Sequence, residues 1–253
     1  MNRIILETKN LSKEFRGFTA VNRVNLQIQR GHIHALIGPN GAGKTTCFNL
    51  LTKFLVPTGG QIFFNGRDIS AARPAQIARL GIIRSFQISA VFPHLTVLQN
   101  VRIGLQRTLK TSFQFWRSER SLSTLDARAM ALLEEVDLAP FADAVTIDLP
   151  YGRKRALEIA TTLAMAPELM LLDEPTQGMG HEDVHRVKEL IKKVSAGRTI
   201  LMVEHNMSVV SGICDRISVL QRGTVLAEGS YAEVSGNAQV MEAYLGTDAA
   251  GVH

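Results

Sequence analysis

One segment restricts the possible folds of this chain more than any other. Residues 38–45 read Gly-Pro-Asn-Gly-Ala-Gly-Lys-Thr and match the pattern G-x-x-x-x-G-K-[ST]. An apolar run precedes the segment and a helix-like run follows it, as this motif requires. Glycines let several backbone N–H groups point at an anion, and the N-terminus of the next helix adds a positive field. The segment therefore predicts a loop that binds phosphate groups.

A glycine-rich turn without a ligand is the alternative. A chain of this length and average composition would show the pattern by chance on the order of once in a hundred, so we favour phosphate binding. In this motif Lys44 reaches the β- and γ-phosphates, and the hydroxyl of Thr45 ligates Mg²⁺. The predicted ligands are therefore ATP and Mg²⁺. The predicted nucleotide-binding residues are Gly38, Pro39, Asn40, Gly41, Ala42, Gly43, Lys44, Thr45 and Thr46.

Two acidic residues follow a second apolar run. Leu169 to Leu172 reads as a strand and is followed directly by Asp173 and Glu174. A carboxylate at a strand end beside a phosphate loop can hold Mg²⁺ through water, and we assign this role to Asp173. Glu174 points differently and can accept a proton from an attacking water as a general base. The alternative is that the two acids only cap the turn at Pro175. Because a phosphate loop is also present in the chain, we favour the catalytic interpretation.

A histidine stands at the end of another predicted strand. His205 follows Thr199–Val203, and in a doubly wound sheet the carboxyl ends of the strands face the ligand crevice. We therefore predict that His205 contacts the γ-phosphate, with a purely structural histidine as the alternative. Gln87 ends a short apolar stretch and would by itself be an unremarkable loop amide.

The order of the predicted elements indicates an α/β fold. Strands alternate with helices from residue 169 onward, which is typical of a mostly parallel sheet. Residues 87–166 have mostly helical periodicity, and the alternation at 24–29 predicts an antiparallel strand. The predicted strands are 24–29, 32–37, 61–64, 169–172, 199–203, 217–220 and 224–227, and the predicted helices are 44–55, 125–136, 151–165, 182–194 and one from 206.

Composition excludes several classes of protein. The 253 residues are 45% hydrophobic and 20% charged, as in ordinary globular proteins. Two cysteines, Cys47 and Cys214, cannot form a disulfide framework. The first residues do not resemble a secretory signal, and no apolar run reaches the ~18 residues that span a bilayer. A net charge of +5 without dense basic and aromatic runs predicts no nucleic-acid partner.

These motifs stand in an order that resembles one family. The phosphate loop, Gln87, the stretch Leu149-Pro150-Tyr151-Gly152-Arg153, the Asp173-Glu174 pair and His205 are similar to the motifs of ATP-binding-cassette transporter subunits. The resemblance covers Leu6 to about Gly246. It implies a P-loop NTPase (RecA-like) core with an N-terminal antiparallel β-subdomain and an inserted helical signature subdomain. The implied division is a single domain, 1–246, with core pieces 1–87 and 167–246, a helical subdomain 88–166, and a flexible tail 247–253.

Within that family the chain looks most like the subunits of branched-chain and hydrophobic amino acid importers. The similar segments are Tyr151-Gly152, Leu157-Glu158-Ile159-Ala160, Gly178-Met179-Gly180, residues 203–207 and the ending Ala243-Tyr244-Leu245-Gly246. The resemblance implies a transported solute of that class or a related small organic molecule.

The resemblance also implies roles for single residues. An N-terminal aromatic stacks on adenine, with Phe15 the best match and Phe18 the reserve. Gln87 senses the γ-phosphate and Mg²⁺, and it joins Glu174 and His205 in catalysis. Thr45, Gln87 and Asp173 form the metal set. Residues 178–181 line a dimer seam, and Pro150, Tyr151, Gly152 and Arg153 contact the ATP bound by a second subunit.

One departure from the family pattern concerns this trans contact. The usual signature is Leu-Ser-Gly-Gly-Gln, whereas this chain has Pro150 at the serine, Tyr151 at the first glycine and Arg153 at the glutamine. Proline has neither a hydroxyl nor an N–H. The orphan amides and dipole of the following helix still favour an anion, and Arg153 adds positive charge. Our hypothesis is that this signature binds ATP in trans, less tightly than a serine form.

Partners and location follow from the same resemblance. It implies a homodimer or a heterodimer with a second ATP-binding subunit, attached to transmembrane permease subunits at the cytoplasmic side of the inner membrane. The apolar run Ile88 to Leu98 is a candidate docking segment for a permease helix, or else ordinary core. The alternatives are a soluble ATPase of the same superfamily without a transport role, and a cassette with weakened hydrolysis that regulates a partner.

Overall fold

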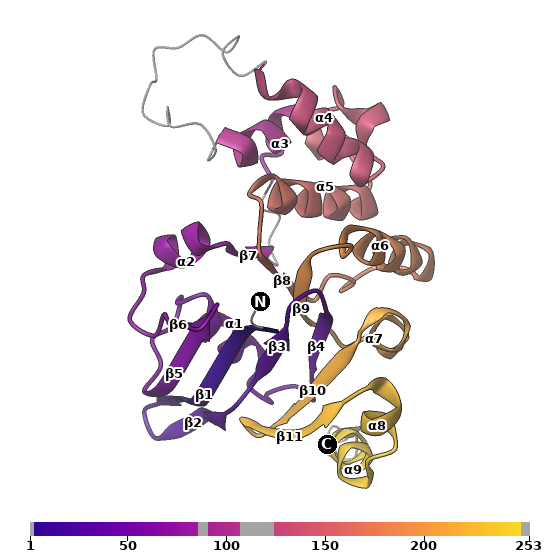
Figure 1. The fold of residues 1–253 in the computed structure, drawn as a ribbon. Helices are drawn as coiled ribbons and strands as arrows, with labels where there is room; N and C mark the ends of the chain where they lie inside the picture. The colour runs from indigo at the N-terminus through magenta and orange to yellow at the C-terminus, as the bar shows by residue number, and fades with distance from the viewer. Residues whose placement is uncertain (1–2, 86–90, 107–123, 249–253) are drawn as a thin grey trace.

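A computed structural model describes residues 3–85, 91–106 and 124–248 (Figure 1). Its centre is a sheet in the order β11-β10-β4-β9-β8-β7. The strands from β10 to β7 are parallel, and β11 is antiparallel to β10. The bounds are β4 Ile33–Ile37, β7 Ile82–Ser85, β8 Leu169–Asp173, β9 Thr199–Val203, β10 Arg216–Gln221 and β11 Thr224–Gly229. The predicted parallel α/β core is confirmed.

Three strands of this sheet are buried along their whole length. β4, β8 and β9 have no exposed residue because both faces of the sheet are covered, which explains their continuous apolar sequence. Alternate side chains enter different cores. Met170 and Leu172 pack with the helices on one face, whereas Leu169 and Leu171 pack with α1 and the N-terminal sheet on the other.

The second sheet is antiparallel and runs β2-β1-β5-β6, with β3 also paired to β1. Its strands are β1 Ile4–Phe15, β2 Phe18–Val24, β3 Gln27–Gln29, β5 Gly59–Phe64 and β6 Arg67–Asp68. The single strand predicted for residues 24–29 is wrong. The chain breaks there because Arg23 adopts a left-handed φ of 49° and the side chain of Asn25 bonds to the backbone of Arg23 and Asn10 instead of continuing the ladder.

Helix α1, Lys44–Leu51, starts at the phosphate loop and lies between the two sheets, where Phe48 is fully buried. The sequence predicted that this helix continues to Leu55. It ends earlier because Lys53 takes a left-handed φ of 62° and its ammonium bonds the carbonyl of Ser70. The other face of the central sheet is covered by α6, His181–Val194, and α7, Met207–Ile213.

A group of helices lies at one end of the molecule, at the top of Figure 1. It contains α3 Val97–Leu105, α4 Asp126–Glu135 and α5 Tyr151–Ala164, with short 3-10 turns at Ala139–Phe141 and Thr146–Asp148. Helix α2, Pro74–Leu80, was not predicted, and it precedes β7. Helices α8, Tyr231–Ser235, and α9, Ala238–Asp248, pack beside β11 at the opposite end (Figure 1). Helix α9 extends beyond residue 246, where the sequence predicted a flexible tail.

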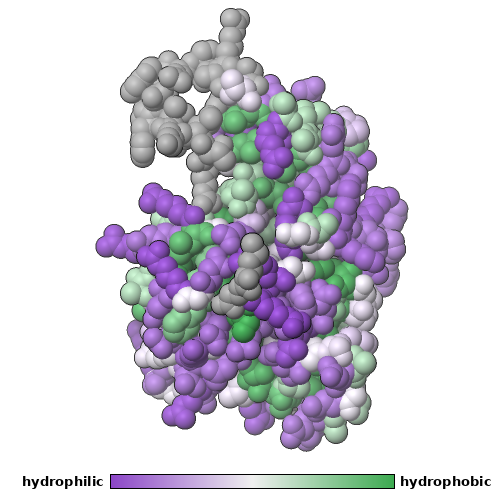
Figure 2. Space-filling model, in the orientation of Figure 1, coloured by the Kyte–Doolittle hydropathy of each residue, from purple (hydrophilic) through white to green (hydrophobic). Residues whose placement is uncertain are grey.

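The molecular surface is mixed in polarity. Figure 2 shows a face on which hydrophilic side chains predominate and apolar ones form small separate groups. In the part of the chain that the structure describes, no helix is both long and apolar enough to cross a bilayer.

Gly104 provides a test of the packing between α3 and α5. A Cβ at this position would lie 2.8 Å from the Cβ of Ala164 and 2.9 Å from the carbonyl oxygen of Thr161. Alanine ordinarily stabilises a helix relative to glycine by about 1 kcal/mol. We expect Gly104→Ala to lower the free energy of unfolding by ~1–3 kcal/mol instead, because the two helices must separate. Urea denaturation measures this change.

Gly212, in α7, is the matched control. A Cβ there would meet the end of the Lys188 side chain, 3.2 Å from Nζ, and a flexible side chain can move away. Gly212→Ala should leave the stability unchanged or raise it. If Gly104→Ala is as stable as the unmodified protein, the close packing of α3 on α5 is not required.

Candidate functional site

The phosphate loop is held by close backbone contacts that only glycine permits. Gly38 follows β4 with φ 148°, and a Cβ there would lie 2.1 Å from the carbonyl oxygen of Leu220 in β10. Gly43 caps α1 with φ 101°, and its Cβ would lie 2.4 Å from the carbonyl oxygen of Ala20. The loop is therefore fixed between the central sheet and β2, with its amides at the N-terminus of α1.

Lys44 is folded over the loop that precedes it. Its Nζ donates to the carbonyl oxygens of Gly38 at 2.6 Å and Pro39 at 2.9 Å. Burial lowers the pKa of Lys44 and the nearby carboxylate of Glu174 opposes that effect. An anion placed in the loop would compensate the buried cation, which is the electrostatic basis for phosphate binding here.

A pocket of about 300 Å³ lies over the loop. It brings together predicted site residues that are far apart in the chain, and its lining comprises Phe18, Ala20, Asn40, Gly41, Ala42, Gly43, Lys44, Thr45, Thr46, Glu174 and His205. Of the two candidate adenine-stacking residues, Phe18 lines this pocket and Phe15 does not. Phe18 is 65% exposed and pairs across the β1–β2 hairpin with Phe15, whose ring lies 5.0 Å from the ammonium of Lys13.

Glu174 and His205 contact each other at the edge of this pocket. The His205 Nε2 atom lies 2.8 Å from the Glu174 Oε1 atom. Glu174 adopts a left-handed φ of 45°, and its N–H donates to the carbonyl oxygen of Val203 at the end of β9. This unusual backbone conformation places a carboxylate, 12% exposed, in the lining of the phosphate-loop pocket just beyond the end of a buried strand.

Asp173, the last residue of β8, has a side chain that is only 2% exposed. It forms an ion pair with the guanidinium of Arg84 in β7, a residue that the sequence did not single out. Gln87, which was predicted both as a metal residue and as a catalytic residue, lies outside the described residues.

The donor set around the loop suits magnesium. Mg²⁺ prefers hard oxygen ligands and usually keeps several waters while binding one or two carboxylates and substrate phosphates. Thr45, whose hydroxyl is such an oxygen, lines the phosphate-loop pocket. Asp173 does not line this pocket, and its carboxylate pairs with Arg84. Among the described residues there is no cluster of three or more acidic, histidine or cysteine side chains that would hold a metal alone. The phosphates of a bound nucleotide would supply further oxygen ligands to a magnesium ion here.

Glu204 is a buried residue beside the site that sequence reasoning missed. Its carboxylate is buried, at 2% exposure, between the turns that follow β8 and β9. It accepts hydrogen bonds from the N–H groups of Thr176 at 3.2 Å, His205 at 2.6 Å and Asn206 at 3.0 Å, and from the Thr176 hydroxyl. The available signal was its position directly after the apolar strand that ends at Val203. A carboxylate that is buried there needs hydrogen-bond donors around it.

Arg155 is a second such residue. It lies on α5 and is 7% exposed, and it donates to the carbonyl oxygens of Asp173 at 3.1 Å and Pro175 at 3.2 Å. Its remaining nitrogen pairs with Glu158 at 2.5 Å. The helix that begins at the signature is thus bonded directly to the turn that carries Glu174.

The signature residues lie away from the phosphate-loop pocket. Pro150 caps α5, and Tyr151, its first residue, is 58% exposed. The guanidinium of Arg153 lies over the ring of Phe141, 3.8 Å from its centroid. A Cβ on Gly152 would lie 2.7 Å from a carboxylate oxygen of Asp183, so α5 lies close to the Asp183 side chain of α6 at this position. Pro150, Gly152 and Arg153 line a separate pocket.

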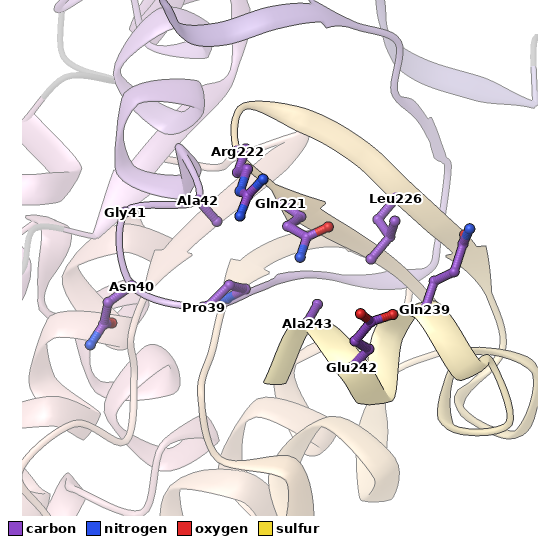
Figure 3. A pocket seen from close by; sticks show the side chains of 10 residues that line it. All are labelled: Pro39, Asn40, Gly41, Ala42, Gln221, Arg222, Leu226, Gln239, Glu242 and Ala243. Atoms are coloured by element: carbon purple, nitrogen blue, oxygen red, sulfur yellow. The ribbon is translucent and has the colours of Figure 1, made fainter. Parts of the chain in front are cut away.

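The C-terminal helix reaches the other side of the phosphate loop. A pocket of about 520 Å³ lies between the loop, the β10–β11 turn and α9. Figure 3 shows the side chains that line it. Burial raises the pKa of Tyr244 on α9 to about 12, and a hydrogen bond with the backbone of Gly38 acts in the opposite direction. The pocket is lined by Pro39, Asn40, Gly41, Ala42, Gln221, Arg222, Leu226, Gln239, Glu242 and Ala243.

Comparison with known proteins decides the family. Residues 21–177 match the family model described as ABC transporter. The chain belongs to the ATP-binding-cassette transporter family. It is accordingly an ATP-binding and ATP-hydrolysing transporter subunit, as its motifs predicted. Residues 224–250 match a second model, described as branched-chain amino acid ATP-binding cassette transporter, and this segment includes the whole of α9.

Curated relatives are similar over nearly their whole length. The chain is 40% identical to the high-affinity branched-chain amino acid transport ATP-binding protein BraF of Pseudomonas aeruginosa, with 97% of this chain and 99% of that protein covered. It is also 40% identical to the high-affinity branched-chain amino acid transport ATP-binding protein LivG of Escherichia coli, with 97% of this chain and 99% of that protein covered. It is 36% identical to a probable LivG of Archaeoglobus fulgidus, over 96% and 95%.

Solved structures show the same fold. An ABC-transporter ATP-binding cassette in its ADP conformation has a TM-score of 0.83 at 28% identity, with 96% of this chain and 99% of that chain covered. A dimeric cassette in a post-hydrolysis state, bound to ADP and phosphate, has a TM-score of 0.75 at 26% identity, covering 89% and 98%. The predicted P-loop NTPase architecture is therefore confirmed.

Glu204 provides a test of how the site is held together. In Glu204→Gln an NH₂ group replaces one acceptor and faces buried donors. We expect the free energy of unfolding to fall by about 1–3 kcal/mol and ATP hydrolysis to fall with it, because the turns that carry Glu174 and His205 lose their shared acceptor. Thermal unfolding and steady-state ATPase measurements check this.

Glu182→Gln is the matched control, since the Glu182 side chain is 81% exposed on α6. It should change neither quantity. Equal stability of both variants would show that the Glu204 carboxylate is not needed to hold the two turns.

Proposed function

We propose that this cassette powers an importer for branched-chain or other hydrophobic amino acids, or a related small organic solute. The main support is the 40% identity to BraF and LivG over nearly the whole length of the chains. Both are described as high-affinity branched-chain amino acid transport ATP-binding proteins. The match of residues 224–250 to the branched-chain cassette model supports the same substrate class.

In the proposed reaction the phosphate loop positions ATP and Glu174 activates water. Loop amides and Lys44 hold the phosphates, while Thr45, Asp173 and Gln87 would hold Mg²⁺, which would neutralise charge on the phosphate oxygens when bound. A water attacks the γ-phosphorus, Glu174 accepts its proton, and the bond from the γ-phosphorus to the bridging oxygen breaks to give ADP and phosphate. His205, 2.8 Å from Glu174, holds that carboxylate and contacts the γ-phosphate.

Adenine stacks on Phe18 in this proposal, and Phe15 supports the hairpin from the other strand. Phe18 lines the phosphate-loop pocket and leaves an exposed aromatic face beside it, as base stacking requires.

The site is completed by a second cassette, identical or related. Pro150, Tyr151, Gly152 and Arg153 do not line the phosphate-loop pocket of their own chain, which fits a head-to-tail pairing in which they face the partner's ATP. The dimeric cassette bound to ADP and phosphate supports a dimer. For Arg153 to contribute charge, its side chain must leave the ring of Phe141.

The permease subunits dock on an apolar patch beside the helical group. Phe92, Val145 and Ile147 are 52%, 37% and 50% exposed. A bridge from Thr96 to Val145 and a bond from the N–H of Ile147 to the carbonyl of Pro93 bring their segments together. A short permease helix would cover these side chains. The cassette is then peripheral, on the cytoplasmic side of the inner membrane.

Glu174→Gln tests the general base. The amide cannot take the proton from water, so ATP hydrolysis should fall by about 100-fold or more while ATP affinity is kept. The variant should accumulate as an ATP-bound dimer in size-exclusion chromatography with light scattering. Glu134→Gln, an exposed glutamate on α4, is the control and should behave as the unmodified protein. Undiminished hydrolysis would remove Glu174 from the base role.

Pro150→Ser tests the departure in the signature. A serine hydroxyl would add a donor to the partner's γ-phosphate, so the ATPase rate or the ATP-dependent dimer affinity should rise. Pro150→Ala removes the proline ring without adding a hydroxyl and separates the two effects. If serine and alanine give the same values as proline, the missing hydroxyl has no influence.

A further inference from the structure

A largely buried arginine neutralises the carboxylate that the proposed function assigns to magnesium. The side chain of Arg84 is 10% exposed and that of Asp173 is 2% exposed, and they form an ion pair at the carboxyl end of the central sheet. A second guanidinium nitrogen of Arg84 donates to the side-chain oxygen of Asn49, on α1, at 2.6 Å. The guanidinium thus joins the helix of the phosphate loop to the last residue of β8.

The surroundings of Arg84 hold it in this position. It lies on β7 with its Cα opposite that of Leu171 in the neighbouring parallel strand β8. Its guanidinium is 5.8 Å from the centroid of the Phe48 ring. Its Nε atom is buried without a hydrogen-bond partner among the described residues. Arg84 thus leaves one buried N–H unpaired while its other nitrogens bond Asp173 and Asn49. This arrangement indicates that the contact with the Asp173 carboxylate determines where the guanidinium lies.

Charge balance indicates what the pair does. In the part of the chain that the structure describes, Arg84 is the cation that pairs with Asp173. A buried carboxylate without a counter-charge is strongly unfavourable, and it would attract a divalent cation with or without nucleotide. With Arg84 present the pair is neutral, and the guanidinium repels an incoming Mg²⁺. The phosphates of a bound nucleotide add negative charge, so that Mg²⁺ is attracted to the site again.

We propose that Arg84 is a positioning residue that makes magnesium binding at Asp173 depend on nucleotide. It occupies Oδ2 of Asp173 and weakens the binding of free Mg²⁺ to the empty cassette. When the phosphates of ATP or ADP are in the loop, Mg²⁺ binds with them. The inference rests on the proposed role of Asp173 as a metal residue, and the experiment separates the two.

The experiment measures thermal unfolding of the nucleotide-free cassette with EDTA and with MgCl₂ at constant ionic strength. The unmodified protein should show no shift with MgCl₂. Arg84→Met should unfold roughly 5 °C lower in EDTA, because a buried carboxylate loses its partner, and MgCl₂ should restore part of this loss. The corresponding Mg²⁺ affinity of the empty variant should be at least tenfold tighter than that of the unmodified protein.

Three variants control the assignment. Arg84→Lys keeps the charge and should remain insensitive to MgCl₂. Arg84→Gln removes the charge with less disturbance, and it should show the same stabilisation by MgCl₂, so it replaces Arg84→Met if that variant does not fold. In the double variant Arg84→Met with Asp173→Asn the stabilisation should disappear, because the carboxylate that binds the ion is gone.

Binding of a fluorescent ADP analogue with and without MgCl₂ tests the underlying role of Asp173. Asp173→Asn should lose most of the magnesium dependence of ADP binding. If it does, and the Arg84 variants are as insensitive to MgCl₂ as the unmodified protein, the ion pair is only structural and the inference on Arg84 is wrong. If Asp173→Asn keeps the full magnesium dependence, the metal role of Asp173 is wrong and the inference on Arg84 fails with it.

Discussion

The parallel alignment of β4, β9, β8 and β7 is the constraint on which the whole site depends. Parallel strands end at the same edge of a sheet, so the residues that follow them meet there. Gly38 follows β4, Asp173 ends β8, and His205 lies two residues beyond β9. Because β4, β8 and β9 are buried on both faces, their ends are fixed by two cores. The sheet therefore supplies rigid positions for a reaction that needs mainly positioning and charge.

Buried polar side chains secure the turns at that edge. Glu204 bonds the turn after β8 to the turn after β9, and Arg155 bonds the first of these turns to α5. Arg84 joins β7, β8 and α1. A buried charge is tolerated only when its partners are in place, so each of these residues strongly favours one arrangement of the loops. The same bonds connect the signature helix to the turn that carries Glu174.

The sequence predicted the parts of this site that follow from local patterns. The phosphate loop, the acids after β8 and the histidine after β9 each stand beside a strongly apolar run, and a family resemblance added their roles. The supporting residues could not be predicted in the same way. Arg84 and Glu204 pair with groups far away in the chain, and nothing beside them in the sequence indicates those partners. The choice between Phe15 and Phe18 depended on a hairpin, where neighbouring aromatic residues face different surroundings.

Transport by the assembled importer tests the central claim most directly. The cassette would be purified with the permease subunits that bind it and reconstituted with them in vesicles that contain ATP and Mg²⁺ on the cassette side, together with the extracytoplasmic binding protein of the same system. The account predicts that labelled leucine or isoleucine moves across the membrane from the side of the binding protein to the side of the cassette. This movement should require ATP, and Glu174→Gln should abolish it. Hydrolysis of ATP without any movement of branched-chain or other hydrophobic amino acids would contradict the proposed function.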